Sequence, residues 1–360
     1  MTHPTGRWFK LIREVWDYNA TSRFGPLPPK ALIVVLTYRC NSKCQMCNIW
    51  KMKTGKEMEY EGWEKAAKDP VFKNVDTLTV SGGEGMLYPQ YLKTVKMWME
   101  KLLKLRKLIL NTNGFLPEDI ARKVEKVARM CVERNIQLGV SVSVDGLGKR
   151  HDEIRRVRDG FKKVLKTIKY LEKMKQKKWL DFGVASLLME NNLSDYWEMK
   201  KWCIQRGLDY SFQLIGFHDT YVNNMESQKN LDFKKSQKGE LLKIIEDIRK
   251  NQKGIGIAGY YWADMLKFYQ GRRRQTPCPF LLDEVVVDSL GDVYYCLSTE
   301  RIGNIIKEKR SVGEIYFDPK NIIHRKMMWK NECRRCNSGC DVVRAIAGEM
   351  WKFTGYKLAG

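Results

Sequence analysis

The chain has 360 residues and is strongly basic, with 65 Lys and Arg against 42 Asp and Glu and a formal net charge of +23. Its 43% hydrophobic and 11% aromatic content excludes a disordered chain, and no segment reaches the roughly 18 unbroken apolar residues of a membrane-spanning helix. The first residues, MTHPTGRWFKLIREVW, lack the separate apolar run of a secretory signal. We therefore expect a cytoplasmic protein with one large core and a smaller satellite.

The positive charge would suit a nucleic acid or an anionic membrane surface as a partner. Lysines, however, are spread over nearly every helix-like stretch of the chain. A solvated, lysine-rich surface is therefore favoured over a nucleic-acid or membrane-binding face.

In chain order, residues 1–30 are expected to form a helical segment, because Trp8, Ile12 and Val15 recur at helical spacing. That helix would dock on the protein rather than lie on a membrane. Short strand-like runs then alternate with longer amphipathic stretches. The expected strands are Leu32–Leu36, Thr77–Val80, Leu108–Asn111, Gln137–Val144, Phe182–Leu187 and Ser211–Ile215. The expected helices are Met58–Lys68, Tyr91–Leu105, Pro117–Glu133, Phe161–Lys175 and Asp195–Arg206.

Six strand–helix units are too few for a closed eight-stranded barrel, so residues 31–216 predict an α/β fold, a partial (β/α)6 TIM-like barrel. A ligand would lie at the carboxyl ends of its strands. Residues 217–274 are expected to be a connecting helical region, with a polar loop at Asn223–Lys238 and a helix at Leu241–Lys250. Residues 275–360 hold five of the ten cysteines and a hairpin pattern, EVVVDSLGDVYYC, which indicates a small metal-binding extension.

Three of the cysteines, Cys40, Cys44 and Cys47, lie together directly after the first expected strand. In a chain without a secretory signal, cysteines in such a group favour metal ligation over disulfides. Zinc sites usually combine two pairs of ligands, whereas three local thiolates leave one metal position open for a bound ligand. A cysteine-rich zinc loop and three buried thiols are the alternatives.

The spacing C-x₃-C-x₂-C after a first strand resembles the signature of the radical S-adenosylmethionine (radical SAM) superfamily. The resemblance implies that the three thiolates hold a [4Fe–4S] cluster whose fourth iron binds the amino and carboxylate groups of S-adenosylmethionine. The resemblance covers about residues 31 to 215, because further segments similar to those of the family follow in the order in which the family has them. These segments are Ser81–Glu84, Asn111–Gly114, Val142–Gly146 and His151–Arg155.

The same resemblance assigns cofactor contacts to Met46, Ser81, Gly82, Gly83, Glu84, Asn111, Ser143 and Arg155. The Ser81–Glu84 segment would bind the methionine amino group, and Arg155 would pair with the carboxylate. A surface charge is the alternative for Arg155, and a core position is the alternative to adenine packing for Met46. The family usually continues with Pro-Leu after the Glu, whereas Gly85 and Met86 stand here.

The C-terminal cysteines resemble the SPASM and twitch extensions, which carry auxiliary iron–sulfur clusters. A full SPASM domain has seven cysteines, but this stretch has five, so the resemblance implies one auxiliary [4Fe–4S] cluster. Cys278, Cys296 and Cys333 would be ligands, with Cys336 and Cys340 competing for the fourth position. Structural zinc is the alternative. Cys131 and Cys203 lie on apolar helix faces and are expected in the core, with a thiol hydrogen donor as the alternative.

As a radical SAM enzyme, the chain would cleave S-adenosylmethionine reductively to a 5′-deoxyadenosyl radical that takes a hydrogen atom from its substrate. Flavodoxin or ferredoxin would supply the electron. We rank a sugar or polyol, dehydrogenated or epimerised, before a ribosomally made peptide, a lipid or an RNA nucleoside. No leader-binding domain precedes Leu32, which lowers the peptide in this order. A non-catalytic electron carrier would explain the cysteines but not the Glu84 and Arg155 segments.

Overall fold

The computed structural model describes residues 25–52, 55–251, 257–339 and 352–355, together with Trp16 and Ala20. By packing, the chain divides into two units. One, here called the barrel unit, comprises Pro29–Phe233 and Val285–Tyr316, and the other comprises residues 1–28, 234–284 and 317–360. The N-terminal helix expected around Trp8, Ile12 and Val15 lies outside the described residues, as does Cys340.

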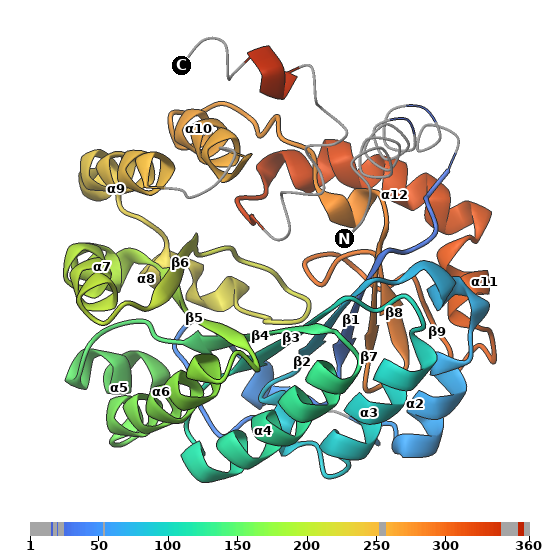
Figure 1. Cartoon of the computed structure of the whole chain (residues 1–360). Helices are drawn as coiled ribbons and strands as arrows, with labels where there is room; N and C mark the ends of the chain where they lie inside the picture. The colour runs from blue at the N-terminus through green and yellow to red at the C-terminus, as the bar shows by residue number, and fades with distance from the viewer. Residues whose placement is uncertain are drawn as a thin grey trace. The chain divides into compact units, whose positions relative to one another are not determined.

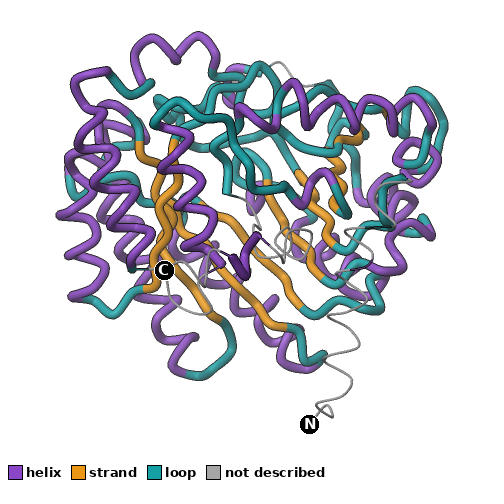
Figure 2. The backbone as a smooth tube through the Cα atoms, turned by 90° about the horizontal axis from the view of Figure 1, so that it is seen from above, coloured by secondary structure: helices purple, strands orange, loops and turns teal. Residues whose placement is uncertain are grey.

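The barrel unit is built on an open sheet whose first six strands are parallel and follow the expected order (Figures 1 and 2). Strands β1 to β6 span Ala31–Val35, Thr77–Ser81, Lys107–Thr112, Gln137–Ser143, Asp181–Leu188 and Asp209–Leu214. The strand order is β6-β5-β4-β3-β2-β1-β7-β8-β9, so β6 and β9 are the two edges. The α/β class and the partial barrel predicted from the sequence are confirmed.

Helices join the parallel strands, and α2, α3, α4 and α6 lie along the outer side of the sheet in Figure 1. The helices α2 to α7 span Tyr60–Ala67, Tyr91–Lys101, Pro117–Glu133, Lys149–Arg155, Gly160–Gln176 and Tyr196–Gln205. Helix α4 begins with Pro117 and buries Ile120, Val124 and Cys131 on one stripe. Cys203 of α7 is buried as well, which confirms the core positions expected for both cysteines.

The two faces of the sheet differ in side-chain size and polarity. In β3, Leu108 and Leu110 are buried, whereas Ile109 between them and Asn111 after them are more exposed. Because parallel pairing keeps the strands in register, one face collects small and polar residues. These are Thr79, Ser81, Asn111, Ser141, Ser143, Gly183, Ala185, Ser211 and Gln213, and they share the face with the larger apolar residues Ile33, Val35, Ile109 and Leu187. Small side chains leave room for a ligand on this face.

An antiparallel hairpin extends the sheet beside β1 and continues to a short third strand. Strands β7, β8 and β9 span Glu284–Asp288, Asp292–Tyr294 and Gly303–Asn304, and α11 follows at Val312–Tyr316. Gly291 in the turn has a φ of 79°, and a Cβ there would lie 2.8 Å from the Ile306 side chain, so glycine is required. The predicted hairpin is confirmed. By packing it belongs to the barrel unit, whereas the sequence grouped it with residues 275–360.

The stretch Asn223–Lys238, expected to be a polar loop, instead contains short helical turns. They are Met225–Ser227, α8 at Gln228–Leu231 and Lys235–Gln237. Leu231 is buried in an apolar cluster with Met46. This single apolar side chain anchors the helical turn, which the polar composition of the stretch did not predict.

In the other unit, the longest described helices are α9, α10 and α12, at Lys238–Lys250, Ile257–Tyr269 and Pro319–Asn331. Helix α9 buries Leu241, Ile244 and Ile248 on one side. Helix α12 starts at Pro319, and the Asp318 carboxylate caps it by accepting a hydrogen bond from the Lys320 N–H. Over the described residues, none of the helices combines the length and apolarity needed to cross a membrane.

Candidate active site

Cys40, Cys44 and Cys47 lie on the loop that follows β1, at the carboxyl end of the parallel strands. Cys44 is buried and the other two are partly buried. Burial raises the pKa of Cys40 to about 12 and that of Cys47 to about 11, so these thiols need a cationic partner to ionise. An iron–sulfur cluster is such a partner, because it binds thiolates and displaces their protons.

The three thiols fit such a cluster in donor type and in position on one loop. Within the described chain, however, no three His, Cys, Asp or Glu side chains are arranged so that they could hold a metal ion. The ligand set Cys40, Cys44 and Cys47 therefore stays a prediction.

The cysteine loop, residues 40–47, is fastened to the C-terminal end of α5. The Gln45 N–H donates to the Ile154 carbonyl at 3.0 Å, and the Ser42 hydroxyl donates to the Arg155 carbonyl at 2.8 Å. The same hydroxyl lies 2.9 Å from the Cys44 Sγ. The position of Cys44 thus depends on the backbone of a helix more than a hundred residues later in the chain.

Arg155 is not a surface charge, because its side chain is only 13% exposed and forms an ion pair with the fully buried Asp145 at 2.5 Å. Its guanidinium also lies 3.7 Å from the Cys44 Sγ. Burial opposes the charge on Arg155, but the Asp145 carboxylate and the Cys44 thiol raise its pKa beyond the ordinary value. Arg155 therefore places a permanent cation beside the cysteine loop, which favours anionic groups there.

The Ser81–Glu84 segment packs tightly on residues 37–39, which lead from β1 into the cysteine loop. The Gly83 N–H donates to the Thr37 carbonyl at 2.9 Å and the Glu84 N–H donates to the Arg39 carbonyl at 2.8 Å. A Cβ on Gly83 would lie 2.5 Å from the Arg39 oxygen, so a larger residue would push the two loops apart. The glycine therefore sets the spacing between this segment and the cysteines.

The Glu84 carboxylate is buried and joins the ends of β2 and β3. It accepts hydrogen bonds from the Asn113 N–H at 2.7 Å and from the Thr112 hydroxyl at 3.1 Å. Burial raises the pKa of Glu84 to about 7 although these hydrogen bonds oppose the shift. The Glu84 side chain therefore positions the segment after β3.

Asn113 is the residue of its segment that reaches the cysteine loop, and the sequence analysis missed it. Its side-chain amide lies 4.0 Å from the Cys40 Sγ and donates to the Asn41 side chain at 2.7 Å. Asn111, the residue that the sequence resemblance indicated, lies in β3 and pairs with Ser141. The only signal for Asn113 was its place directly after the strand.

Ser81, Asn111 and Ser143 share the small, polar face of the sheet near its carboxyl end. Met46 is 5% exposed and packs with Cys44, Ile154 and other apolar side chains, as its core alternative required. The contacts of all four residues with a cofactor stay predictions.

The loop after β6, residues 216–224, covers the cysteine loop and was not foreseen as part of the site. The Asn48 N–H donates to the Val222 carbonyl at 2.9 Å, and the Asn224 side chain donates to the Met46 carbonyl at 3.0 Å. The Tyr221 hydroxyl donates to the Gly82 carbonyl at 2.7 Å. One loop thus contacts both segments that the sequence assigned to cofactor binding.

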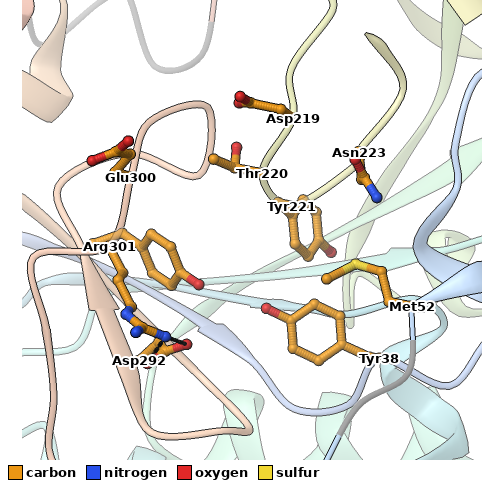
Figure 3. A pocket seen from close by; sticks show the side chains of 10 residues that line it. Tyr38, Met52, Asp219, Thr220, Tyr221, Asn223, Asp292, Glu300 and Arg301 are labelled. Atoms are coloured by element: carbon orange, nitrogen blue, oxygen red, sulfur yellow. Dashed lines mark hydrogen bonds and ion pairs between the residues drawn. The ribbon is translucent and has the colours of Figure 1, made fainter. Parts of the chain in front are cut away.

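A pocket of about 440 Å³ opens beside these loops, entirely within the barrel unit (Figure 3). Tyr38, Tyr221 and Tyr294 give it aromatic walls. Its other lining residues are Met52, Asp219, Thr220, Asn223, Asp292, Glu300 and Arg301. Because Tyr38 precedes Cys40 by two residues and Tyr221 is bonded to Gly82, the pocket borders both the cysteine loop and the glycine segment.

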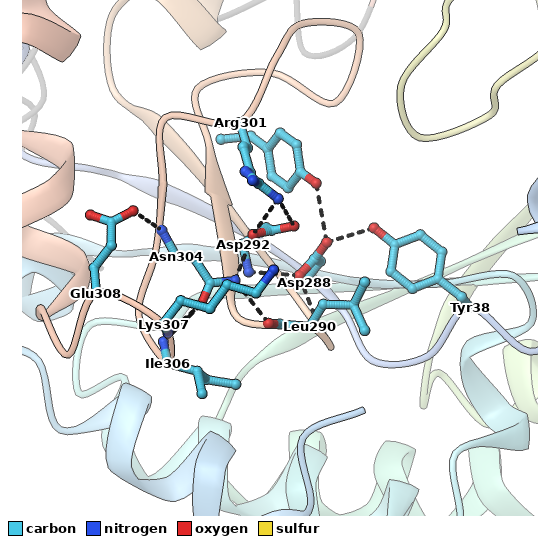
Figure 4. Close-up of polar contacts among 10 residues, drawn as sticks. Tyr38, Asp288, Leu290, Asp292, Arg301, Asn304, Ile306, Lys307 and Glu308 are labelled. Atoms are coloured by element: carbon cyan, nitrogen blue, oxygen red, sulfur yellow. Dashed lines mark hydrogen bonds and ion pairs between the residues drawn. The ribbon is translucent and has the colours of Figure 1, made fainter. Parts of the chain in front are cut away.

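A buried carboxylate, Asp288, ties the cysteine loop to the hairpin (Figure 4). The hydroxyls of Tyr38 and Tyr294 donate to it at 2.6 and 3.2 Å. The backbone N–H groups of Leu290 and Asp292 donate to its other oxygen. Burial raises the pKa of Asp288 to about 6 against the effect of several of these hydrogen bonds. This network holds two walls of the pocket.

The C-terminal cysteines are divided between the two units. Cys278, Cys333 and Cys336 belong to one unit, Cys296 belongs to the barrel unit, and Cys340 is outside the described residues. The auxiliary ligand set therefore stays a prediction.

Arg274 lies among the C-terminal cysteines of its own unit and is 1% exposed. Its guanidinium donates to the Ser338 carbonyl at 2.7 Å and to the Pro277 carbonyl at 3.2 Å. Burial opposes its charge, but Cys278, then Tyr261, and then Cys336 and Cys333 raise its pKa. Like Arg155, Arg274 is a buried cation beside cysteines.

Comparison with known proteins shows which family and which proteins this chain is similar to. Residues 34–203 match the Radical SAM superfamily. Two curated relatives are the sporulation killing factor maturation protein SkfB of Bacillus subtilis, 26% identical over 180 residues, and the pre-heme d1 synthase of Dinoroseobacter shibae, 28% identical over 188 residues. These alignments cover 50% and 51% of this chain but only 40% and 42% of the relatives.

Among solved structures, SuiB of Streptococcus suis bound to its precursor peptide SuiA is similar in fold, with a TM-score of 0.59. It is 16% identical, and the match covers 92% of this chain and 75% of SuiB. The family match spans β1 to α7, with the cysteine loop, Glu84, Asn113 and Arg155 inside it. Residues 34–203 therefore form a radical SAM domain.

Proposed function

We propose that this chain is a radical SAM enzyme that modifies a peptide. The observation that carries the proposal is the family match over residues 34–203, the part of the chain in which Cys40, Cys44 and Cys47 share one loop. The cofactors of this family are S-adenosylmethionine and a [4Fe–4S] cluster, which together supply a radical able to remove a hydrogen atom from a C–H bond.

The residues around the cysteine loop have separate tasks in this proposal. Cys40, Cys44 and Cys47 hold the cluster, and Arg155 balances negative charge beside Cys44. The missing Cβ atoms of Gly82 and Gly83 let the Ser81–Glu84 segment pack closely on Thr37 and Arg39, and this segment would bind the methionine part of the cofactor. The loop of residues 216–224 covers the site and limits the access of water to it.

A peptide now ranks above the sugar or polyol that we placed first from the sequence. SkfB is named as a maturation protein, and SuiB binds the precursor peptide SuiA. A small-molecule substrate is the second candidate, since the pre-heme d1 synthase is similar over 188 residues.

The second cysteine group completes the proposal. Cys278, Cys296 and Cys333, with Cys336 or Cys340, would hold one auxiliary [4Fe–4S] cluster. Such a cluster can accept an electron from the substrate, which would make the net reaction an oxidation. Without that transfer, return of a hydrogen atom would give an epimerised product. A flavodoxin or ferredoxin would reduce the first cluster.

The proposal is tested with anaerobically reconstituted protein, S-adenosylmethionine, dithionite and an extract of cells that carry the gene. The extract is separated by size, and half of each fraction is treated with protease. We expect formation of 5′-deoxyadenosine to rise with a peptide fraction and to lose this rise after proteolysis. Stimulation by a protease-resistant fraction of small molecules would favour the second candidate. No cleavage of S-adenosylmethionine under any condition would contradict the enzyme class.

A further inference from the structure

The pocket beside the cysteine loop differs in charge from the protein as a whole. Its lining contains Asp219, Asp292, Glu300 and one cation, Arg301, in a chain whose net charge is +23. Three carboxylates and one guanidinium leave the pocket with a formal charge of −2. The basic surface of the chain attracts anions, whereas the acidic, aromatic pocket favours a cation. The ligand of the pocket therefore differs in charge from ligands that bind the surface non-specifically.

The carboxylates are not equivalent. Asp292 is buried, pairs with Arg301 at 3.4 Å and accepts a hydrogen bond from the Asn304 amide at 2.6 Å. Asp219 and Glu300 are exposed to the pocket, and neither has a hydrogen-bond or ion-pair partner among the residues that the structure describes. The −2 charge is therefore available to a ligand and resides on these two side chains.

The pocket has a charged end and an aromatic end. In Figure 3, Asp219 and Glu300 lie at one end with Thr220 between them, while Tyr38 and Met52 lie at the other. The aromatic end is the one beside Cys40. Tyrosine faces and carboxylates together bind ammonium and guanidinium groups, through cation–π and ionic contacts.

We propose that this pocket binds a cationic residue of the substrate peptide, a lysine, an arginine or an N-terminal amine. Asp219 and Glu300 hold its charge, and the tyrosine rings contact its apolar stem. This inference rests on the proposed function and narrows its substrate class. The volume of about 440 Å³ lies within the roughly 300–1,000 Å³ of ligand pockets and has room for a peptide side chain. A phosphate or another anion would be repelled by the unpaired carboxylates of Asp219 and Glu300.

The loops that carry the two carboxylates give them a defined position. The Thr220 hydroxyl donates to the Leu297 carbonyl at 2.6 Å, which joins the loop after β6 to the segment after β8. Asp219 and Glu300 flank this junction in the sequence. Because the junction is made by Thr220 and backbone, neutral substitutions of the two carboxylates leave it intact.

The test is a selection from a random octapeptide display library on the reconstituted full-length protein. We expect Lys and Arg to be enriched about fivefold, as two partly exposed ion pairs allow. In the Asp219→Asn, Glu300→Gln double variant the enrichment should disappear. The matched control, Glu133→Gln with Glu198→Gln, removes two exposed carboxylates from α4 and α7 and should retain it. Circular dichroism and thermal unfolding check that all three proteins are folded.

The net charge makes the result decisive, since non-specific binding to a +23 chain enriches acidic peptides instead. Enrichment of Asp and Glu alone, or of Lys and Arg equally in the double variant, would overturn the inference. The selection needs no turnover. Its failure therefore contradicts the binding of a cationic residue by this acidic pocket, whereas absent cleavage of S-adenosylmethionine contradicts the proposed function.

Discussion

The two cysteine groups of this protein are organised in opposite ways. Cys40, Cys44 and Cys47 occupy one loop in one packing unit. A backbone hydrogen bond joins that loop to α5, and the Ser81–Glu84 segment bonds to Thr37 and Arg39 just before it. The C-terminal cysteines come from separate segments, and Cys296 belongs to a different unit from Cys278 and Cys333. Sequence spacing can identify a site of the first kind, whereas a site of the second kind depends on tertiary structure.

Despite this difference, each group has a buried arginine beside its thiols. Arg155 pairs with Asp145 and approaches Cys44, and Arg274 bonds to the carbonyls of Pro277 and Ser338. A buried cation lowers the cost of holding thiolates and a negatively charged cluster. The shared feature suggests a way to disturb each group separately.

The largest effect is expected from replacing the first group. With Cys40, Cys44 and Cys47 changed to Ala, cleavage of S-adenosylmethionine should be abolished. The iron content should fall by about half from the roughly eight atoms of two [4Fe–4S] clusters. Chromatographic detection of 5′-deoxyadenosine and an iron assay measure both. The control changes the buried Cys131 and Cys203 to Ala and should keep the iron. Persistent cleavage in the triple variant would be incompatible with the assigned site.

A smaller loss is expected at the second group when Arg274 is changed to Gln. The variant lacks the cation and its bonds to the segments that flank Cys278 and Cys336. It should lose the auxiliary iron, about four atoms, while 5′-deoxyadenosine still forms. Lysine at this position should recover part of the iron, because it restores charge without the paired hydrogen bonds. The exposed neighbour Arg273, changed to Gln, is the control. Full iron in the Arg274 variant would show that the second group does not need this cation.

The spacing of the first group is tested by Gly83→Ala. The new Cβ would lie 2.5 Å from the Arg39 carbonyl oxygen, and such overpacking destabilises by about 1–3 kcal/mol. Urea unfolding should show this loss, and affinity for S-adenosylmethionine should weaken. Gly85→Ala in the same segment is the control, since its Cβ would be 3.9 Å from Val80. If Gly83→Ala and Gly85→Ala have the same free energy of unfolding, the close approach of Gly83 to the Arg39 carbonyl oxygen is refuted.

The last effect is confined to pH-dependent stability and concerns Asp288, which links Tyr38, just before the cysteine loop, to the hairpin. Its pKa is raised from 3.8 to about 6 in the folded protein, so the folded state holds a proton that the unfolded state releases. Stability from this group is present below pH 3.8 and is lost as the pH rises through 6. Asp288→Asn should therefore gain about 2 kcal/mol relative to wild type between pH 4.5 and 7.5. Urea unfolding measures it, with exposed Asp232→Asn as the control. If the difference in free energy of unfolding between Asp288→Asn and wild type is the same at pH 4.5 and pH 7.5, the raised pKa of Asp288 is contradicted.

The sequence predicted what depends on neighbouring residues. The six parallel strands, the hairpin around Gly291 and the grouping of Cys40, Cys44 and Cys47 all follow from local patterns of apolar residues, turns and spacing. Asn113 and the loop of residues 216–224 were missed, because their importance comes from contacts with residues far away in the chain. For the same reason the sequence could not show that the hairpin extends the sheet beside β1.

The most direct test of the account is electron paramagnetic resonance of the reduced Cys278→Ala, Cys296→Ala variant, recorded with and without S-adenosylmethionine. This variant should retain the first cluster alone, so every cluster signal comes from the Cys40, Cys44 and Cys47 loop. We predict a [4Fe–4S] signal that changes when S-adenosylmethionine is added, because the cofactor binds the iron that lacks a thiolate. A spectrum that is identical with and without S-adenosylmethionine would contradict the claim that this loop forms the active site.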